Sequence, residues 1–255
     1  MEYGLIGEKL SHSYSKVIHE SLADYQYELK PLNLDEFHYF MEEKNFRAIN
    51  VTIPYKRDVI PYLNIIDEKA KKIGAVNTII NKNGRLTGYN TDYDGFLYTL
   101  NYYNITIKNQ KVLVLGNGGA ALAVLAVLKF LEASEIIIVK HKTEPGTITY
   151  EEAKTLYSDA SVIINTTPVG MYPNVDASPI DLSYYHSLTA VVDLIYNPIT
   201  TKLLSQAREL EIKAVGGLMM LVTQAKFAAE LFCNRKLSEN VVEPIVQKIE
   251  EELSN

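Results

Sequence analysis

The middle of the chain contains short apolar runs in which polar residues do not alternate with apolar ones. These runs cover residues 111–115, 136–139, 162–165, 190–194 and 212–215, and helical stretches separate most of them. A strand with one solvent-exposed face has alternating polar and apolar residues, whereas a strand buried on both faces is apolar throughout. Strands of this kind, separated by helices, are typical of a parallel sheet that is covered on both faces. We therefore expect an α/β fold.

The first of these runs leads into a glycine-rich turn and then a helix rich in alanine and leucine, expected to extend to about residue 132. The turn fits the pattern G-x-G-x-x-A with Gly116, Asn117, Gly118, Gly119, Ala120 and Ala121. Glycines allow a tight turn and the close approach of a pyrophosphate, and the helix N-terminus supplies free N–H groups and a positive dipole end. In this context nucleotide binding is favoured over a simple turn.

The end of the next strand indicates which nucleotide is bound. NAD sites commonly place an acidic residue there, which accepts a hydrogen bond from the ribose 2′-hydroxyl. Here the strand continues into Lys140, His141, Lys142 and Thr143, and no acid precedes Glu144. Cations and a hydroxyl suit the 2′-phosphate of NADP, and the alternative is a solvated basic turn. The segment 140–150 is also too short for a full crossover helix.

The first ninety residues have a more mixed pattern. We expect strands at 3–6, 27–32 and 48–53, and two further strands flanking Asn83-Gly84, a strong hairpin signal. Helices are expected at 15–22, from about residue 35, and at 67–73, where Gly74 would end the helix. The end of the sequence, residues 240–253, has the apolar stripe of an amphipathic helix.

The strand expected at 48–53 carries the first candidate catalytic group. Asn50 and Thr52 are two positions apart and would share one face of this strand. Pro54 has no N–H and would end the ladder, so that Lys56 projects beyond the carboxyl end of the strand, where α/β sheets place their ligands. This placement suits proton transfer on a polyhydroxy substrate. The alternative is an ordinary surface lysine.

Two other polar clusters are candidates for binding. Ser11, Ser13 and Ser15 precede the first helix and would suit a small carboxylate, although Ser15 could instead be the helix N-cap. Asn77 and Asp92 flank the expected hairpin and would supply hydrogen bonds beside Lys56. Turn chemistry, or helix capping by Asp92, is the alternative for this second cluster.

Composition limits the possible functions. With 255 residues, 47% hydrophobic and 22% charged, the chain is typical of a soluble globular protein of one large or two small domains. Its net charge of −6 argues against nucleic-acid binding. Cys233 is the only cysteine and the five histidines lack ligand spacing, so no metal site is expected. The chain shows no basic signal-peptide region and no uninterrupted apolar span, which indicates a cytoplasmic protein without membrane contact.

Seven motifs, in order, resemble those of the shikimate dehydrogenase family over essentially the whole chain. They occupy residues 13–15 (SYS), 50–56 (NVTIPYK), 74–78 (GAVNT), 88–95 (GYNTDYDG), 116–120 (GNGGA), 165–171 (NTTPVGM) and 217–225 (GLMMLVTQA). The resemblance implies a two-domain α/β enzyme with a cleft between the domains. Residues 1–93 plus 218–255 would form the substrate domain and 94–217 the Rossmann-like NADP domain. The reaction would be the reversible, NADPH-dependent reduction of 3-dehydroshikimate to shikimate, on the route to chorismate and aromatic amino acids, in a monomer or homodimer.

The resemblance also assigns roles to individual residues. Lys56 would be the catalytic acid–base, with Asp92 beside it. Substrate contacts would come from Ser13, Ser15, Asn50, Thr52, Asn77, Tyr196 and Gln224, with the two serines on the carboxylate. Cofactor contacts would come from Gly116, Asn117, Gly118, Gly119, Ala120, His141, Lys142, Thr143, Thr166 and Gly217.

The sequence departs from the family pattern at three places. Lys16 replaces a proline after the serine pair, Asn117 replaces an alanine in the glycine turn, and His141-Lys142-Thr143 replaces the usual N-R-T. The third departure leaves an NAD-using quinate/shikimate dehydrogenase as an alternative. A catalytically silent regulatory relative is a second alternative, which the intact Lys56 and Asp92 disfavour. A methylene-tetrahydrofolate dehydrogenase-like enzyme is disfavoured by the serine pair.

Overall fold

The computed structural model describes residues 1–10, 13–142 and 144–254, and the chain divides into two compact units. The first contains Met1–Gly95 and Leu221–Ile245, and the second contains Phe96–Met220 and Val246–Asn255. The divisions fall inside three helices: α4 (Thr91–Tyr102), α8 (Leu218–Cys233) and α9 (Val242–Ser254). The domain bounds expected from the sequence stay a prediction.

The first unit is built on a mixed six-stranded sheet with the order β2-β1-β3-β5-β6-β4. Its strands are β1 (Tyr3–Gly7), β2 (Glu28–Pro31), β3 (Ala48–Val51), β4 (Ile65–Ile66), β5 (Thr78–Lys82) and β6 (Arg85–Tyr89). The helical segments are α1 (Ser15–Leu22), α2 (Leu34–Glu43), α3 (Glu68–Ile73) and the 3₁₀ turns η1 (Ile60–Tyr62) and η3 (Glu239–Val241). Strands β1, β2 and β3 are parallel, and β5 runs antiparallel to β3 and β6.

Apolar side chains cover both faces of this sheet. On one face Phe37 and Met41 of α2 pack with Ile49 and Ile79 of the strands. On the other face Ala228 and Phe232 of α8 pack against Tyr3, Leu5 and Ala48. The sheet is therefore rigidly supported at the point where β3 ends, which is where the candidate lysine follows.

The hairpin between β5 and β6 has the turn that the sequence predicts. Lys82 pairs with Arg85, and the two residues between them, Asn83 and Gly84, have φ of 54° and 82°. Positive φ at both positions belongs to the tight turn that matches strand twist. The register also pairs Thr78 with Tyr89, so the polar residues just before β5 and just after β6 are brought side by side.

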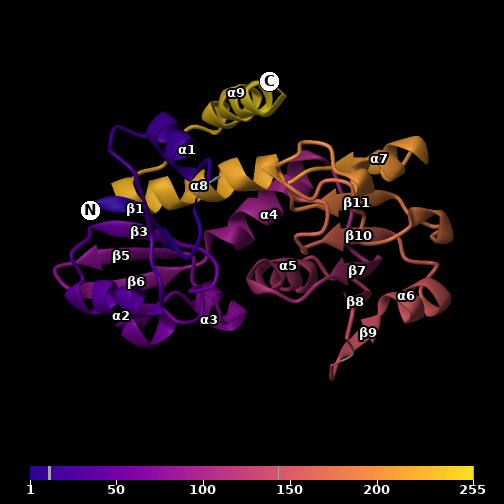
Figure 1. Ribbon diagram of the computed structural model, residues 1–255, viewed down its shortest axis with the longest axis horizontal. Coiled ribbons are helices and arrows are strands. Elements are labelled where there is room, and N and C mark those ends of the chain that lie inside the picture. The colour runs from indigo at the N-terminus through magenta and orange to yellow at the C-terminus, as the bar shows by residue number, and fades with distance from the viewer. Residues whose placement is uncertain (11–12, 143, 255) are drawn as a thin grey trace. The chain divides into compact units, whose positions relative to one another are not determined.

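The second unit has a fully parallel six-stranded sheet in the order β12-β11-β10-β7-β8-β9. Its strands are β7 (Lys111–Leu115), β8 (Glu135–Lys140), β9 (Thr147–Thr149), β10 (Val162–Asn165), β11 (Ala190–Asp193) and β12 (Lys213–Val215). The additional helical segments are α5 (Gly119–Phe130), α6 (Tyr150–Leu156), α7 (Lys202–Glu209) and η2 (Leu182–Tyr184). Figure 1 shows α5 on one side of this sheet and α6 and α7 on the other, as expected for a doubly covered sheet.

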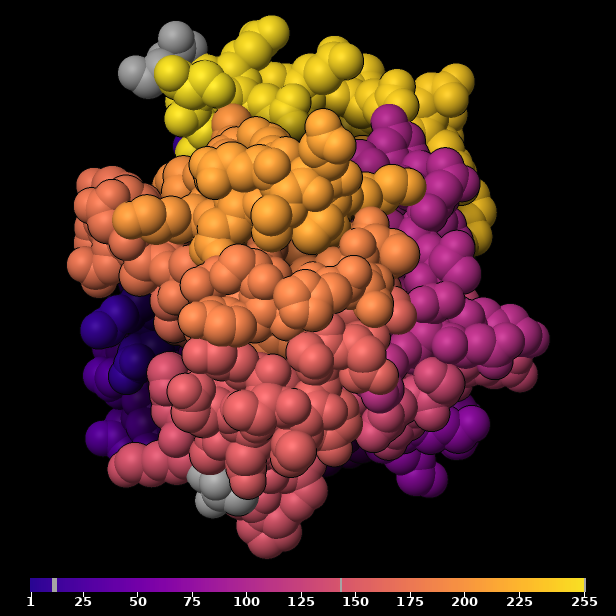
Figure 2. Space-filling model, turned by 90° about the vertical axis from the view of Figure 1, so that its right-hand side faces the viewer, coloured from indigo at the N-terminus to yellow at the C-terminus, as the bar shows by residue number. Residues whose placement is uncertain are grey.

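The outer face of the second unit follows the order of its strands. In Figure 2 the segments of this face change from orange near α7 to pink near α6, as the sheet beneath runs from β12 to β9.

Within the residues that the structure describes, no helix combines the length and apolar character needed to cross a bilayer.

Several local predictions are confirmed and others need correction. The strand expected at 48–53 ends at Val51, although the N–H of Thr52 still bonds the carbonyl of Ile6 at 2.9 Å. Residues 140–142 and 144–149, the described part of the segment expected to lack a crossover helix, contain no helix but do contain the unpredicted strand β9. The N-cap of α1 is Tyr14, so the suggestion that Ser15 caps this helix is wrong.

Gly217 occupies a position with no space for a side chain. A Cβ on this residue would lie 2.0 Å from the carbonyl oxygen of Leu194, so the backbone itself would have to move. We expect Gly217→Ala to lower the free energy of unfolding by about 3 kcal/mol, measured by urea denaturation. Gly118→Ala is the matched control, because no atom lies within 4 Å of its Cβ position. Equal stability of the two variants would contradict this prediction.

Candidate active site

Lys56 is placed by a turn that is anchored at both sides. The preceding Tyr55 is buried, donates a hydrogen bond to the carbonyl of Leu32 at 2.7 Å, and stacks on Phe37 with ring centroids 4.2 Å apart. The carbonyl of Lys56 accepts from the N–H of Val76 at 2.8 Å. The backbone of Lys56 is therefore fixed, and its long side chain extends across the carboxyl end of the sheet.

The ammonium group of Lys56 forms an ion pair with Asp92, a residue of the first turn of α4. Lys56 Nζ lies 2.6 Å from Asp92 Oδ2, and the two side chains are only 13% and 10% exposed. Asp92 thus does not cap α4, and that alternative is wrong: the preceding Asn90 accepts from the N–H of Tyr93 at 3.2 Å. A shielded ammonium held by a carboxylate is suited to give and take a proton.

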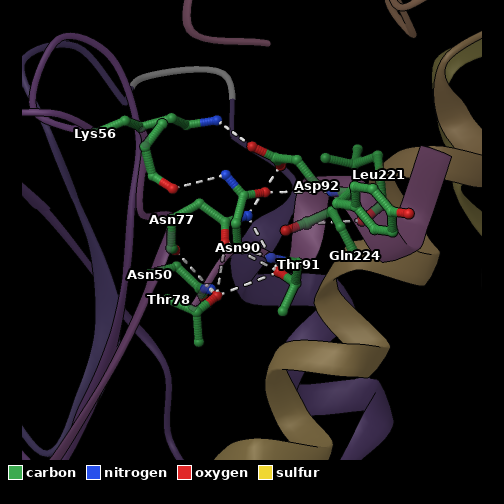
Figure 3. A network of polar contacts seen from close by, with 11 residues as sticks. Asn50, Lys56, Asn77, Thr78, Asn90, Thr91, Asp92, Leu221 and Gln224 are labelled. Atoms are coloured by element: carbon green, nitrogen blue, oxygen red, sulfur yellow. Dashed lines mark hydrogen bonds and ion pairs between the residues drawn. The ribbon is translucent and has the colours of Figure 1, made fainter. Parts of the chain in front are cut away.

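Asn77 connects this pair to a second layer of polar groups. Its Nδ2 donates to Asp92 Oδ1 at 2.9 Å and to Thr91 Oγ1 at 3.1 Å. Its Oδ1 accepts from the N–H of Thr91 at 2.8 Å and from the hydroxyl of Thr78 at 2.9 Å. Figure 3 shows Asn77 among these residues, with Lys56 and Asp92 at one end of the network and Asn50 and Thr78 at the other. These four hydrogen bonds fix the orientation of the Asn77 amide. Asp92 is therefore held by Asn77 at one carboxylate oxygen and by Lys56 at the other.

Asn50 lies on β3 and is oriented by an aromatic cluster. Its Nδ2 donates to Thr78 Oγ1 at 3.0 Å, and its Oδ1 accepts from the hydroxyl of Tyr27 at 2.7 Å. The ring of Tyr27 stacks on His19 at 4.0 Å, and His19 Nδ1 is 2.7 Å from the hydroxyl of Tyr25. Burial lowers the pKa of His19 to about 3, so the imidazole is neutral. Sequence reasoning missed Tyr27, because a single tyrosine just before β2 does not show that its hydroxyl bonds a side chain of β3.

The remaining proposed substrate residues have simpler surroundings. Thr52 is half-buried just beyond β3, and Gln224 of α8 donates from Nε2 to the carbonyl of Leu221 at 2.9 Å. Ser13 donates from Oγ to Ser15 Oγ at 3.0 Å and accepts from the N–H of Ser15 at 3.3 Å. Ser11, the third serine of this loop, lies outside the described residues.

The glycine turn of the second unit has the geometry that a phosphate group requires. Gly116 has a φ of 93°, and its Cβ position would be 3.0 Å from Thr166 Oγ1. Thr166 donates to the carbonyl of Leu115 at 2.7 Å, which holds the turn closed. The N-cap of α5, Gly118, makes no side-chain cap, and nothing lies within 4 Å of its Cβ position. The residues present therefore fit a dinucleotide, because N–H groups at the start of α5 are open to an anion.

The residues predicted for the 2′-phosphate differ in their surroundings. His141 and Lys142 are exposed directly after β8, and the His141 ring lies 4.7 Å from that of Tyr150. Thr143 lies outside the described residues. Lys140, at the end of β8, is paired with Glu144 at 2.5 Å. No acidic residue precedes Glu144 after β8 in the sequence. The carboxylate of Glu144 nevertheless contacts Lys140, at the end of β8.

Tyr196 and Gly217 lie at the carboxyl end of β11 and at the start of α8. Tyr196 is half-buried, and the N–H of Gly217 bonds the carbonyl of Ile195 at 2.9 Å. The close approach of Gly217 to Leu194 already explains a glycine at this position. Its contact with nicotinamide stays a prediction.

Asp193, at the end of β11, supports the loop that carries Tyr196. Its carboxylate accepts from the hydroxyl of Thr201 at 2.7 Å, from the N–H of Ile195 at 3.1 Å and from the amide of Asn165 at 3.0 Å. Burial raises the pKa of Asp193 to about 6, and these hydrogen bonds oppose the shift.

This raised pKa predicts a change of stability with pH. The unfolded carboxyl titrates near pH 4, so the folded protein binds the proton more tightly between about pH 4 and 6. The contribution of Asp193 to stability should therefore fall as the pH rises through this window, by up to about 3 kcal/mol, and then level off. Urea denaturation at pH 4.5 and 7.5 should show Asp193→Asn gaining stability relative to wild type at the higher pH. A difference that is independent of pH would contradict the prediction.

The described part of the chain contains no group of three or more histidine, cysteine, aspartate or glutamate side chains arranged to hold a metal ion. A parallel α/β unit with an open glycine turn, together with a shielded lysine–carboxylate pair in a polar network, fits the class of nucleotide-dependent α/β enzymes that move a proton.

Comparisons with known proteins give the particular family. The family model for the shikimate dehydrogenase substrate binding domain matches residues 5–79. The chain is 39% identical to a shikimate dehydrogenase (NADP(+)) of Clostridium beijerinckii, over 98% of each sequence. The chain therefore belongs to the shikimate dehydrogenase family.

Solved structures agree in fold over the whole chain. A chorismate mutase/shikimate 5-dehydrogenase fusion protein from Clostridium acetobutylicum is 40% identical, with a TM-score of 0.93 over 99% of this chain and 98% of that one. Shikimate 5-dehydrogenase from Thermus thermophilus, in complex with NADP(H) and shikimate, is 28% identical, with a TM-score of 0.87 over 97% of this chain and 99% of that one. The α/β class expected from the sequence is confirmed.

Proposed function

We propose that this chain catalyses the reversible reduction of 3-dehydroshikimate to shikimate with NADPH. The observation that carries the proposal is the shielded pair of Lys56 and Asp92, oriented by Asn77 at the carboxyl end of the first sheet. The glycine turn before α5 supplies the matching dinucleotide site. Membership of the shikimate dehydrogenase family supports both halves of the assignment.

The lysine performs the proton transfer. When bound, NADPH would supply the hydride for the carbonyl carbon of the substrate. As the C=O bond becomes a C–O single bond, Lys56 donates one proton from its ammonium to the carbonyl oxygen. Asp92 accepts a hydrogen bond from this ammonium and so orients it. In the reverse direction the side chain of Lys56 would accept the proton of the substrate hydroxyl.

The polar network supplies groups for the substrate. We propose that Asn50, Thr52, Asn77 and Gln224 bind ring hydroxyls, and that Tyr196 lines the substrate site. Ser13 and Ser15 would bind the carboxylate, because their hydroxyls lie 3.0 Å apart, close enough to contact one carboxylate group together. Ser13 already bonds Ser15, and Gln224 bonds the carbonyl of Leu221, so a ligand would compete with both bonds.

Initial-rate measurements with shikimate and quinate, each with NADP⁺ and NAD⁺, test the proposal. We expect the highest kcat/KM for shikimate with NADP⁺. Faster turnover of quinate would contradict the substrate assignment and favour a quinate/shikimate dehydrogenase. Absence of turnover in all four assays, with both nucleotides bound, would indicate a regulatory relative.

A further inference from the structure

The loop after β8 contains an acidic residue that is fixed against the candidate cofactor site. Glu144 Oε1 accepts from Lys140 Nζ at 2.5 Å, and Glu144 Oε2 accepts from Asn117 Nδ2, in the glycine turn, at 3.4 Å. The backbone of Glu144 is also held: its N–H donates to Thr147 Oγ1 at 2.9 Å, and its carbonyl accepts from that hydroxyl at 3.0 Å. The carboxylate of Glu144 therefore bridges Lys140, at the end of β8, and Asn117, in the glycine turn.

Charge determines what this arrangement favours. Lys140, with its side chain only 20% exposed, is the least exposed cation of the cluster, and Glu144 already neutralises it. Lys140 in turn lowers the pKa of Glu144, so the carboxylate stays ionised at neutral pH. A 2′-phosphate would meet a negative charge here and would have to compete for Lys140, which leaves Lys142 and His141 as its unopposed partners. A free ribose hydroxyl would instead find the acceptor that NAD sites commonly use.

We propose that Glu144 is a specificity-determining residue that limits the preference for NADP over NAD. It does so by neutralising Lys140 and by offering a carboxylate to the unphosphorylated ribose. The inference rests on the proposed cofactor site. Glu144 adds a negative charge next to the cations of that site. The ratio of the affinities for NADP and NAD then depends on both the positive and the negative charges.

The test is calorimetric titration of 2′,5′-ADP and 5′-AMP, which differ only in the 2′-phosphate, into wild type and Glu144→Gln. We expect Glu144→Gln to bind 2′,5′-ADP about tenfold more tightly, because repulsion is removed and Lys140 is released. Binding of 5′-AMP should be unchanged or weaker. The ratio of kcat/KM for NADPH and NADH should shift in the same direction.

Two further variants make the test specific. Glu151→Gln, an exposed residue at the start of α6, removes one negative charge without touching Lys140 or Asn117, and should leave the ratio of the two affinities within about twofold. In a Lys140→Gln background, Glu144→Gln should lose the part of its gain that comes from releasing Lys140 and keep the part that comes from removing the repulsion. An unchanged ratio in Glu144→Gln, or an equal change in Glu151→Gln, would overturn the inference.

These outcomes are separate from failure of the proposed function. Wild type that oxidises shikimate with NADP⁺, with an unchanged ratio in Glu144→Gln, would overturn the role of Glu144 alone. Wild type that binds neither nucleotide would overturn both proposals.

Discussion

Lys56→Ala is expected to lower kcat for shikimate oxidation by about 10²–10⁴-fold, with a smaller effect on KM. Carbonyl reduction and its reverse both need a proton to move at the substrate oxygen, and a positioned general acid contributes a rate factor of about that size. Lys56 Nζ, paired with Asp92 at the carboxyl end of the first sheet, is the proton donor that we propose. Steady-state kinetics with saturating NADP⁺ measures the effect.

A second lysine–aspartate pair in the same unit provides a matched control. Lys69 and Asp94 form an ion pair at 2.5 Å, but their side chains are 40% and 28% exposed and neither belongs to the network around Asn77. Lys69→Ala should retain kcat within about threefold, because exposed pairs contribute little. A Lys56→Ala enzyme with near-normal kcat and a native circular dichroism spectrum would remove the lysine from its proposed role.

Replacing both Ser13 and Ser15 by alanine should raise KM for shikimate by at least about 100-fold. Each hydrogen bond from a hydroxyl to a carboxylate contributes roughly 1.5–3 kcal/mol, and the variant loses both. Methyl shikimate, which lacks the charge, should be a poor substrate for wild type. The double variant should discriminate less between the acid and its ester, because the groups that recognise the charge are absent.

The control for this experiment is Ser21→Ala, on the same helix α1. Ser21 is exposed and its hydroxyl bonds only the carbonyl of Val17 at 2.7 Å, so KM should be unchanged. Thermal denaturation of both variants tests whether the loss is structural. If the double variant keeps the wild-type KM, the serines serve the start of α1, where Ser13 accepts from the N–H of Ser15.

The sequence predicts those elements whose signal is local. The strand β7, the glycine turn and α5 follow from an apolar run, glycines and a helical stretch that are contiguous. The hairpin follows from Asn83-Gly84 alone, because few residues adopt positive φ at two successive positions. Hairpin pairing then brings Asn77 close to Thr91, so part of the candidate site was also predictable.

Contacts between distant segments leave no such signal. Lys56 and Asp92 are 36 positions apart, and their pairing depends on the length of the turn after β3 and on the start of α4. Glu144 was given no role, because four-residue spacing is known to pair side chains in helices, whereas Lys140 ends a strand. The two-residue strand β4 was missed because its pairing with β6 depends on tertiary structure.

The two compact units divide the proposed chemistry between them. Lys56, Asp92 and every proposed substrate residue except Tyr196 belong to the first unit, whereas the glycine turn and the loop after β8 belong to the second. Mutations that change cofactor choice can therefore accumulate around Glu144 without altering the groups that recognise the acid. In evolutionary terms the specificity for the cofactor and the specificity for the substrate can change separately. A lineage could therefore change from NADP to NAD, or back, while retaining its substrate.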